Sequence, residues 1–294
     1  MKEKIIGRRS FLRYAAAVTA GTGLLGESLL AADKKKNRKW YKTLKIGMLP
    51  RNLSDAEKFR LARKCGFEGI DGVPIDDLNA ARRQAKSAKE AGVPIHGLVY
   101  GWWPPFPGPD MAVVKKSITR MENALRCANA MGASTVLLVP TRLTETFSYA
   151  DAYKRSQQYV RELIPMAEEM RVVIAIENVW NKFLLSPLEF ARYLDELDSP
   201  WVRAYFDVGN VIIYGYAQHW IRTLGKRIIK IDLKDFKRKG YQWTNLLDGD
   251  VNWPQVVRAL DEIGFEGYMT AELHGGDEAY LTDLAGRIDR IFAM

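Results

Sequence analysis

The stretch Val172-Val173-Ile174-Ala175-Ile176-Glu177-Asn178 decides the fold of this chain. Five consecutive apolar residues, four of them β-branched, predict a strand that is buried on both faces, as in a parallel sheet covered by helices. A carboxylate follows directly at the end of this strand. The apolar run Val202–Asp207 comes after the next amphipathic stretch, so the repeating unit is strand, helix, strand.

The same alternation extends in both directions along the chain. Further strand-like runs begin near Leu44, Gly69, Ile95, Thr135, Ile228 and Tyr268. Between them lie helical patterns with recognisable ends: Ser54 and Glu57 form a capping box, Gly66 ends that helix, and Pro254 opens another that Gly264 ends. Eight strands alternating with helices in about 250 residues predict one parallel (β/α)8 TIM barrel, a single α/β domain over residues 44–294.

Two further features of the sequence favour the barrel over a doubly wound sheet. The tetrapeptide Gly66-Phe67-Glu68-Gly69 recurs as Gly264-Phe265-Glu266-Gly267, each time between a helix and a strand. No glycine-rich dinucleotide fingerprint follows the first strand, which disfavours a Rossmann domain.

Composition and charge describe an ordinary globular protein. The chain has 294 residues, 47% of them hydrophobic, and a formal net charge of +9. Residues 1–40 carry +7 of that charge, so the predicted domain carries only +2 and no nucleic-acid partner is expected. Cys65 and Cys127 form no C-x-x-C motif; buried free thiols are favoured over a disulfide.

The N-terminal residues resemble a twin-arginine export signal. Arg8 and Arg9 are followed by Phe11-Leu12 and by a weakly apolar run, Tyr14–Leu25, which is too short and glycine-rich to span a membrane as a helix of about 20 residues. We expect a signal peptide over residues 1–32, a basic linker over 33–43, passage through the twin-arginine translocation machinery, and a periplasmic protein. An uncleaved signal would tether it to the membrane; a cytoplasmic amphipathic leader is the alternative.

Four acidic residues fall at or near the ends of the last four predicted strands: Glu177, Asp207, Asp232 and Glu272. The carboxyl ends of the strands form one face of a TIM barrel, so these side chains should converge. Converging carboxylates repel one another, and a divalent cation relieves that repulsion. The alternative is that each acid only caps a strand or pairs with a Lys or Arg.

These acids lie in motifs that resemble the xylose-isomerase-like barrel family. The motifs are Ile176–Asn181 (IENVWN), Phe206–Asn210 (FDVGN), Leu233-Lys234-Asp235 and Ala271-Glu272-Leu273, and the nearest likeness is to sugar isomerases and 3-epimerases acting on hexulose or ribulose phosphates or on tagatose. The resemblance implies one divalent metal ion held by Glu, Asp, His and Glu, with Mn²⁺ as first choice and Mg²⁺, Co²⁺ or Zn²⁺ as alternatives.

Matched by position, the resemblance makes Glu177 and Glu272 the catalytic proton carriers and metal ligands, and Asp207 a third ligand. Asp232 stands where the family has its His. Strand alternation places Lys230, Asp232 and Lys234 on one side of the strand, so we expect Asp232 to be the fourth ligand. Its added negative charge would need an offset from Lys230, Lys234 or a protonated His274.

Six residues are candidates for substrate binding. Asn210 stands where relatives place a His that contacts substrate, and His96 is either a substrate contact or a packed residue. Trp103 and Trp180 follow strands and could form an aromatic wall against a sugar. Lys234 and His274 complete the set, with His274 also a second choice as metal ligand or proton shuttle.

The function expected from these observations is that of an exported, metal-dependent sugar isomerase or 3-epimerase working through a metal-stabilised enediolate. The partner is a small carbohydrate, with unphosphorylated sugars favoured by export. A lyase or hydratase on a 3-keto-sugar or glycoside and a non-catalytic sugar-binding barrel are the alternatives. The sequence leaves an oligomer open.

Overall fold

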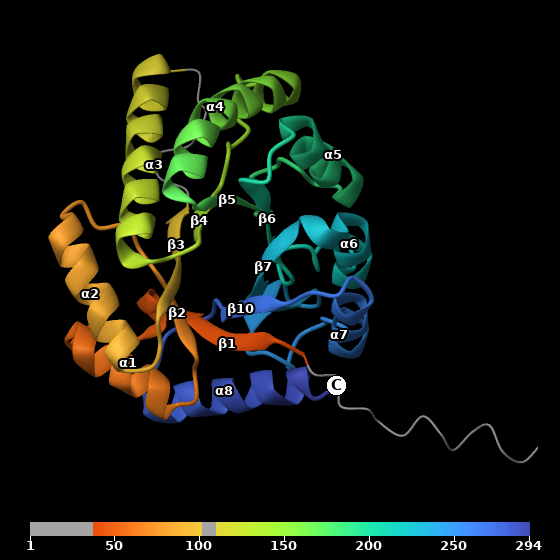
Figure 1. Ribbon diagram of the computed structural model, residues 1–294. Helices are drawn as coiled ribbons and strands as arrows, with labels where there is room; N and C mark the ends of the chain where they lie inside the picture. The colour runs from red at the N-terminus through yellow and green to blue at the C-terminus, as the bar shows by residue number, and fades with distance from the viewer. Residues whose placement is uncertain (1–37, 102–109) are drawn as a thin grey trace, which may run out of the picture. The chain divides into compact units, whose positions relative to one another are not determined.

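Eight parallel strands close into a barrel inside a ring of helices in the computed structural model, which describes residues 38–101 and 110–294 (Figure 1). Around the barrel the strands follow the order β1-β10-β7-β6-β5-β4-β3-β2. Their bounds are β1 (Trp40–Lys45), β2 (Gly69–Gly72), β3 (Ile95–Gly101), β4 (Thr135–Leu138), β5 (Val173–Glu177), β6 (Val202–Asp207), β7 (Ile228–Leu233) and β10 (Gly267–Ala271). The (β/α)8 TIM barrel predicted from the sequence is confirmed.

The helices that cover the barrel bury one apolar stripe each against the strands. They are α1 (Asp55–Lys64), α2 (Leu78–Glu90), α3 (Met111–Met131), α4 (Tyr149–Met170), α5 (Pro187–Leu197), α6 (Ala217–Leu224), α7 (Trp253–Glu262) and α8 (Glu278–Phe292), with short 3-10 turns η1 (Ile46–Met48) and η2 (Gly225–Arg227). Among the described residues, no helix combines the length and apolar character needed to cross a membrane.

The expected helix boundaries are present. Ser54 and Glu57 form the capping box of α1, and Gly66 follows that helix with φ of 93°. Pro254 lies in the first turn of α7, and Gly264 follows that helix with φ of 64°. Glycine is favoured at such helix ends because it adopts positive φ without steric cost.

The first strand begins at Trp40, four residues earlier than expected. Trp40 pairs with Gly267 of β10, and its indole Nε1 donates to the Phe265 carbonyl at 2.8 Å. The apolar run that suggested a strand from Leu44 onward instead turns into η1 at Ile46. Residues 1–37, which include the expected signal peptide and the first part of the expected linker, lie outside the described part of the chain.

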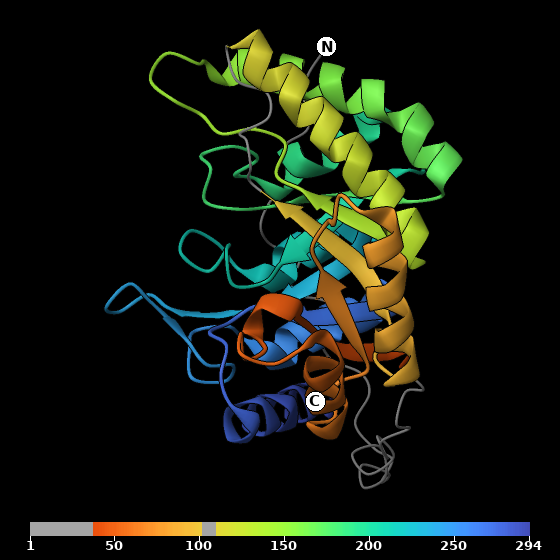
Figure 2. The ribbon, with the colours of Figure 1, turned by 90° about the vertical axis from the view of Figure 1, so that its left-hand side faces the viewer.

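A two-stranded hairpin follows β7 and was not expected from the sequence. It consists of β8 (Asp235–Lys237) and β9 (Gln242–Thr244), and Figure 2 shows it projecting beyond the carboxyl ends of the barrel strands. Asp235 anchors it, because its carboxylate accepts from the backbone N–H groups of Leu247 and Val251 and from the Trp253 indole at 2.9–3.2 Å. The hairpin therefore has a fixed position at the end of the barrel where active sites form.

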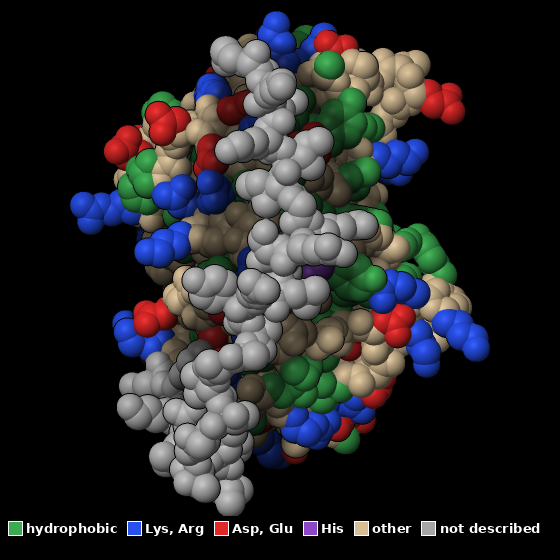
Figure 3. Space-filling view, turned by 90° about the vertical axis from the view of Figure 1, so that its right-hand side faces the viewer, with side chains coloured by type: hydrophobic (Ala, Val, Ile, Leu, Met, Phe, Trp, Pro, Cys, Tyr) green, Lys and Arg blue, Asp and Glu red, His purple; other side chains and the backbone are tan. Residues whose placement is uncertain are grey.

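The described surface carries charges of both signs. Figure 3 shows Lys and Arg side chains interspersed with Asp and Glu over the visible described part of one face. Neighbouring helices are linked by ion pairs such as Arg222–Glu262 and Arg227–Asp195, each at 2.6 Å. Cys65 and Cys127 are free and buried, as favoured from the sequence.

Candidate active site

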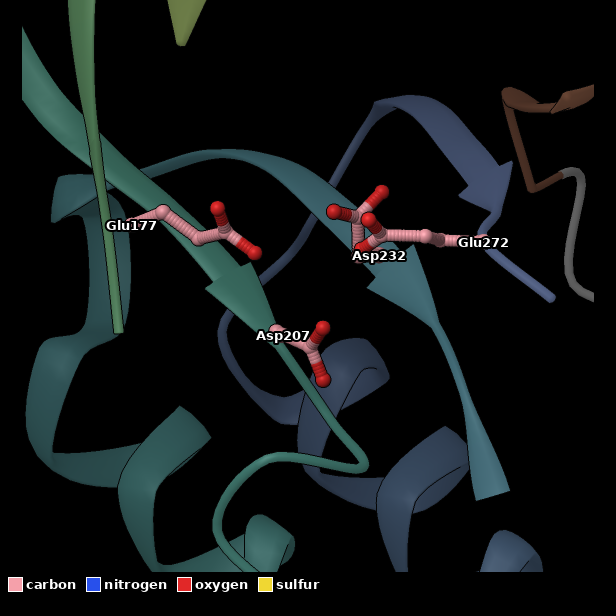
Figure 4. A group of neighbouring side chains, drawn as sticks. All are labelled: Glu177, Asp207, Asp232 and Glu272. Carbon is pink, nitrogen blue, oxygen red and sulfur yellow. The ribbon is translucent and has the colours of Figure 1, made fainter. Parts of the chain in front are cut away.

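The four predicted acids meet at the carboxyl end of the barrel. One carboxylate oxygen from each of Glu177, Asp207, Asp232 and Glu272 lies within 4.8 Å of the others, and Figure 4 shows the side chains pointing into a common space. Parallel register causes this, because Asp207 is the Cα partner of Asp232, and the Glu272 N–H donates to the Leu233 carbonyl beside β7. We call these four residues the carboxylate cluster.

Two asparagines fix one side of the cluster. The Asp207 N–H donates to Asn178 Oδ1 at 2.9 Å, and Asn178 Nδ2 donates back to the Asp207 carbonyl at 2.9 Å. Asn210 donates from its N–H to Asp207 Oδ1 at 2.8 Å and from Nδ2 to the Asn178 carbonyl at 2.9 Å. Asp207 therefore keeps a defined rotamer, with Oδ2 left for the centre of the cluster.

Two lysine ammonium groups lie among the carboxylates. Lys234 Nζ is 2.7 Å from Glu272 Oε2 and 3.2 Å from Asp207 Oδ2. Lys45 Nζ, at the end of β1, is 2.8 Å from both Asp232 Oδ2 and Glu272 Oε2. Gly209 leaves room for Lys234, since a Cβ there would lie 2.5 Å from the Lys234 Cβ. The sequence pointed to Lys234 but not to Lys45.

Glu177 is the exception within the cluster. Among the described residues its carboxylate has no hydrogen bond and no ion pair, although the side chain is buried. Burial raises the pKa of Glu177 well above its usual value, and the nearby Glu272 and Asp232 raise it further, against the lowering effect of Lys45. The surroundings of Glu177 therefore disfavour its charged form.

The pKa values of Glu272 and Asp232 are shifted in opposite directions. Burial raises the pKa of Glu272, but the ion pairs with Lys45 and Lys234 outweigh it and hold that pKa at about 2. Burial, together with Glu272 and Asp207, raises the pKa of Asp232 to about 8 against the opposing effect of Lys45. Glu177 and Glu272, which face one space, thus have pKa values shifted apart, which is the arrangement that acid and base catalysis uses.

Two adjoining pockets open onto the cluster and share Lys234, Trp243 and Glu272. The deeper one has a volume of about 210 Å³ and is also lined by Lys45, Glu177 and Asn210. The outer one, of about 470 Å³, reaches Asn245 and His274. The outer pocket alone falls within the range of about 300–1,000 Å³ that is typical of small-ligand sites.

An aromatic wall borders these pockets. Trp180 stacks on Trp243 of β9 with ring centroids 4.8 Å apart, and Lys234 Nζ lies 5.2 Å from the centroid of the Trp243 ring. Trp180 Nε1 also donates to the Asn210 carbonyl at 2.8 Å. Trp180 was predicted to face substrate, whereas Trp243 was not, because its position depends on the unexpected hairpin.

The remaining substrate-binding candidates have different positions. His274 is exposed and lines the outer pocket. His96 lies near the amino end of β3, where its ring stacks on that of Tyr268 with centroids 3.8 Å apart. It lines neither of these pockets. Trp103 lies outside the described residues.

Deeper in the barrel lies a second charged group, which we call the inner network: Asp71, Lys230, Tyr205 and Thr270. Lys230 ion-pairs with Asp71 Oδ1, while the Tyr205 hydroxyl and Thr270 Oγ1 donate to Asp71 Oδ2 at 2.6 and 3.0 Å. Lys230 thus points inward as alternation predicted, but it pairs with Asp71 and does not offset the cluster. Tyr205 also lies 2.9 Å from Asp232 Oδ1 and links the two groups.

The cluster has the donor set of a site for a hard divalent cation. Carboxylate oxygens are the ligands that Mn²⁺ and Mg²⁺ prefer, and all four residues offer one within 4.8 Å. Asp207 Oδ2 and Glu272 Oε2 are buried and make no hydrogen bond of normal geometry, although both ion-pair with lysine. Glu177, Asp207, Asp232 and Glu272 are therefore the residues that could hold an ion.

Comparison with known proteins identifies the family of this barrel. The family model described as the xylose isomerase-like TIM barrel matches residues 59–289. An L-ribulose-5-phosphate 3-epimerase of Escherichia coli K12 is 22% identical over 231 residues, covering 74% of this chain and 81% of that protein.

Solved structures share the fold at low identity. The 3-keto-D-glucoside 4-epimerase of E. coli superposes with a TM-score of 0.73 at 16% identity, covering 87% of this chain and all of that one. A D-tagatose 3-epimerase-like protein gives a TM-score of 0.74 at 17% identity, covering 85% and 98%. From the extent of the family match, with the barrel and the cluster in place, this chain belongs to the xylose isomerase-like TIM barrel family.

Proposed function

We propose that this protein is a sugar epimerase or isomerase that moves a proton at a carbon next to a carbonyl group. The observation that carries the proposal is the pair Glu177 and Glu272, which reach the same 210 Å³ pocket from strands separated by β6 and β7. Two carboxyl groups on either side of one carbon are what inversion requires, because one takes the proton and the other returns it to the opposite face. The epimerase relatives support this reading.

The opposite pKa shifts suggest a role for each glutamate. Glu272, whose pKa is held low by Lys45 and Lys234, is the proposed proton acceptor, and Glu177, whose pKa is raised by burial, is the proposed donor. In the reverse direction the roles exchange. Lys45 and Lys234 must move part of their hydrogen bonding from Glu272 to substrate oxygens, since a carboxylate with a pKa near 2 is a weak base.

Orientation comes from the residues that line the pockets. The stacked rings of Trp180 and Trp243 offer an apolar face for a sugar ring or chain, and Asn210 holds Asp207 in place behind it. A divalent cation bound at the carboxylate cluster would supply Lewis-acid stabilisation of an enediolate. Metal dependence is part of the proposal, with Mn²⁺ as first choice.

The substrate class follows from the N-terminal resemblance to an export signal. We infer a periplasmic enzyme, and sugar phosphates are mainly cytoplasmic, so an unphosphorylated keto-sugar is the expected substrate. Replacing Arg8 and Arg9 by Lys in the native host should retain the protein in the cytoplasm, as judged by cell fractionation. A wild-type chain found unprocessed in the cytoplasm would contradict the inference.

Proton exchange tests the activity. The full chain with Mn²⁺ in D₂O should incorporate deuterium at the carbon beside the carbonyl of a keto-sugar, followed by mass spectrometry over a panel of phosphorylated and unphosphorylated ketoses. Glu177→Gln is the matched variant and should strongly lower inversion at that carbon, because Glu272 alone can return the proton only to the face from which it was taken. No exchange across the panel would overturn the proposal, and release of an aglycone from a 3-keto-glycoside would instead identify a lyase.

A further inference from the structure

We propose that Lys45 competes with the divalent cation for the carboxylate cluster, so that metal binds this protein weakly and Asp232 pairs with Lys45 instead of serving as a ligand. This inference rests on the proposed metal site. Lys45 is placed by β1, the strand next to β10, and only 12% of its side chain is exposed.

Both carboxylate oxygens of Asp232 lie close to other side chains. Its Oδ2 is 2.8 Å from Lys45 Nζ and its Oδ1 is 2.9 Å from the Tyr205 hydroxyl. Both oxygens of the residue that stands at the family's His position therefore have partners within the protein. An ion that used Asp232 would have to take Oδ2 from Lys45.

One carboxylate oxygen of Glu272 lies close to both lysines. Its Oε2 lies 2.8 Å from Lys45 and 2.7 Å from Lys234. A cation coordinated by the same oxygen would lie within a few ångströms of two ammonium groups in a mostly buried site, where repulsion between like charges is weakly screened. Binding therefore requires at least one lysine to leave.

Charge explains why Lys45 accompanies Asp232. A carboxylate in place of a neutral imidazole adds one negative charge to the cluster, and the Lys45 ammonium adds one positive charge 2.8 Å away. The pair has the net charge of the imidazole that it replaces. Unlike the imidazole, the Asp232–Lys45 pair directs no free lone pair at the ion. It therefore balances the charge of the cluster without supplying a fourth metal ligand.

Calorimetric titration of the full chain with Mn²⁺ alone, without substrate, tests the inference. Lys45→Met frees Asp232 Oδ2 and removes one of the two ammonium groups beside Glu272 Oε2, so it should bind Mn²⁺ at least tenfold more tightly than wild type. Lys45→Arg keeps the charge and should bind like wild type, as should Lys39→Met, which alters an exposed lysine of the same N-terminal region. Lys45→Gln serves as a second neutral variant in case Lys45→Met does not fold.

Thermal unfolding gives an independent readout. Lys45→Met and Lys45→Gln should unfold at lower temperature than wild type without metal, because Asp232 and Glu272 lose a partner, and should gain more stability from Mn²⁺ than wild type does. Neutral variants that bind Mn²⁺ no more tightly than wild type would overturn the inference. Exchange that persists in EDTA with no Mn²⁺ binding to any variant would overturn it together with the proposed metal dependence, while leaving proton transfer by Glu177 and Glu272 standing.

Discussion

The carboxylate cluster and the inner network both bury acids and lysines inside the same barrel, yet they differ in how completely those groups are paired. In the inner network one carboxylate, Asp71, accepts from Lys230, Tyr205 and Thr270. In the cluster four carboxylates share two ammonium groups, and Glu177 has no partner among the described residues. Complete pairing indicates a structural role, whereas an excess of charge beside a pocket indicates a functional one.

The largest effect is expected from breaking the cluster at Glu177. Glu177→Gln should lower the rate of epimerisation by about 10²–10⁴-fold, because an amide cannot return the proton to the opposite face. Its stability in urea should equal or exceed that of wild type, since no ion pair is lost. Glu266→Gln, in an exposed residue, is the control. Epimerisation at the wild-type rate in Glu177→Gln would remove this residue from the mechanism.

Breaking the inner network should affect stability. Asp71 is 1% exposed, so Lys230→Met leaves a buried carboxylate without its cation and should cost about 3–5 kcal/mol of the free energy of unfolding. Urea denaturation measures this. Lys39→Met removes an exposed ion pair and should cost less than about 1 kcal/mol. Similar losses of unfolding free energy in the two variants would mean that the Asp71–Lys230 pair contributes no more to stability than an exposed ion pair.

A smaller effect concerns pH and His96 beside the inner network. Burial and Lys230 hold the pKa of His96 at about 3, against the opposing effect of Asp71. Between the unfolded value of about 6.5 and this folded value, only the unfolded chain takes up a proton at His96, so stability falls as pH falls, by at most about 1.4 kcal/mol per pH unit.

His96→Phe keeps an aromatic ring against Tyr268 and removes that proton uptake. Urea denaturation at pH 6.5 and 4.5 should therefore show a smaller loss of stability in the variant than in wild type. Equal losses would place the acid sensitivity in other groups.

The smallest effect is expected at the aromatic wall of Trp180 and Trp243 that borders the pockets. Trp243→Ala removes half of the aromatic stack and should raise KM about tenfold, the equivalent of about 1.4 kcal/mol, with a smaller change in kcat. Steady-state kinetics on the substrate found by deuterium exchange measure both constants. Trp243→Phe should recover most of the loss. An unchanged KM in Trp243→Ala would show that the hairpin does not contact substrate.

Much of the site was accessible from the sequence because it depends on local rules. Apolar runs ending in Glu177 and Asp207 predicted strands, and parallel strands deliver their last residues to one end of a barrel. Alternation correctly placed Lys230 and Asp232 on the inner side of β7. Neither rule states which side chains meet across the barrel.

Two features needed the tertiary structure. Lys45 and Glu272 are more than 200 residues apart in sequence and meet because barrel closure places β1 beside β10. Trp243 reaches Trp180 only through the hairpin that Asp235 anchors.

The sequence by itself determined the barrel, its helix caps and the four acids at its carboxyl end, since these follow from periodicity and from residues near one another in the chain. Only the tertiary structure decided which charge each acid faces. That Asp71 pairs with Lys230, that Lys45 lies between Asp232 and Glu272, and that Glu177 stays unpaired all depend on closing the strands into a ring, which brings distant side chains within a few ångströms.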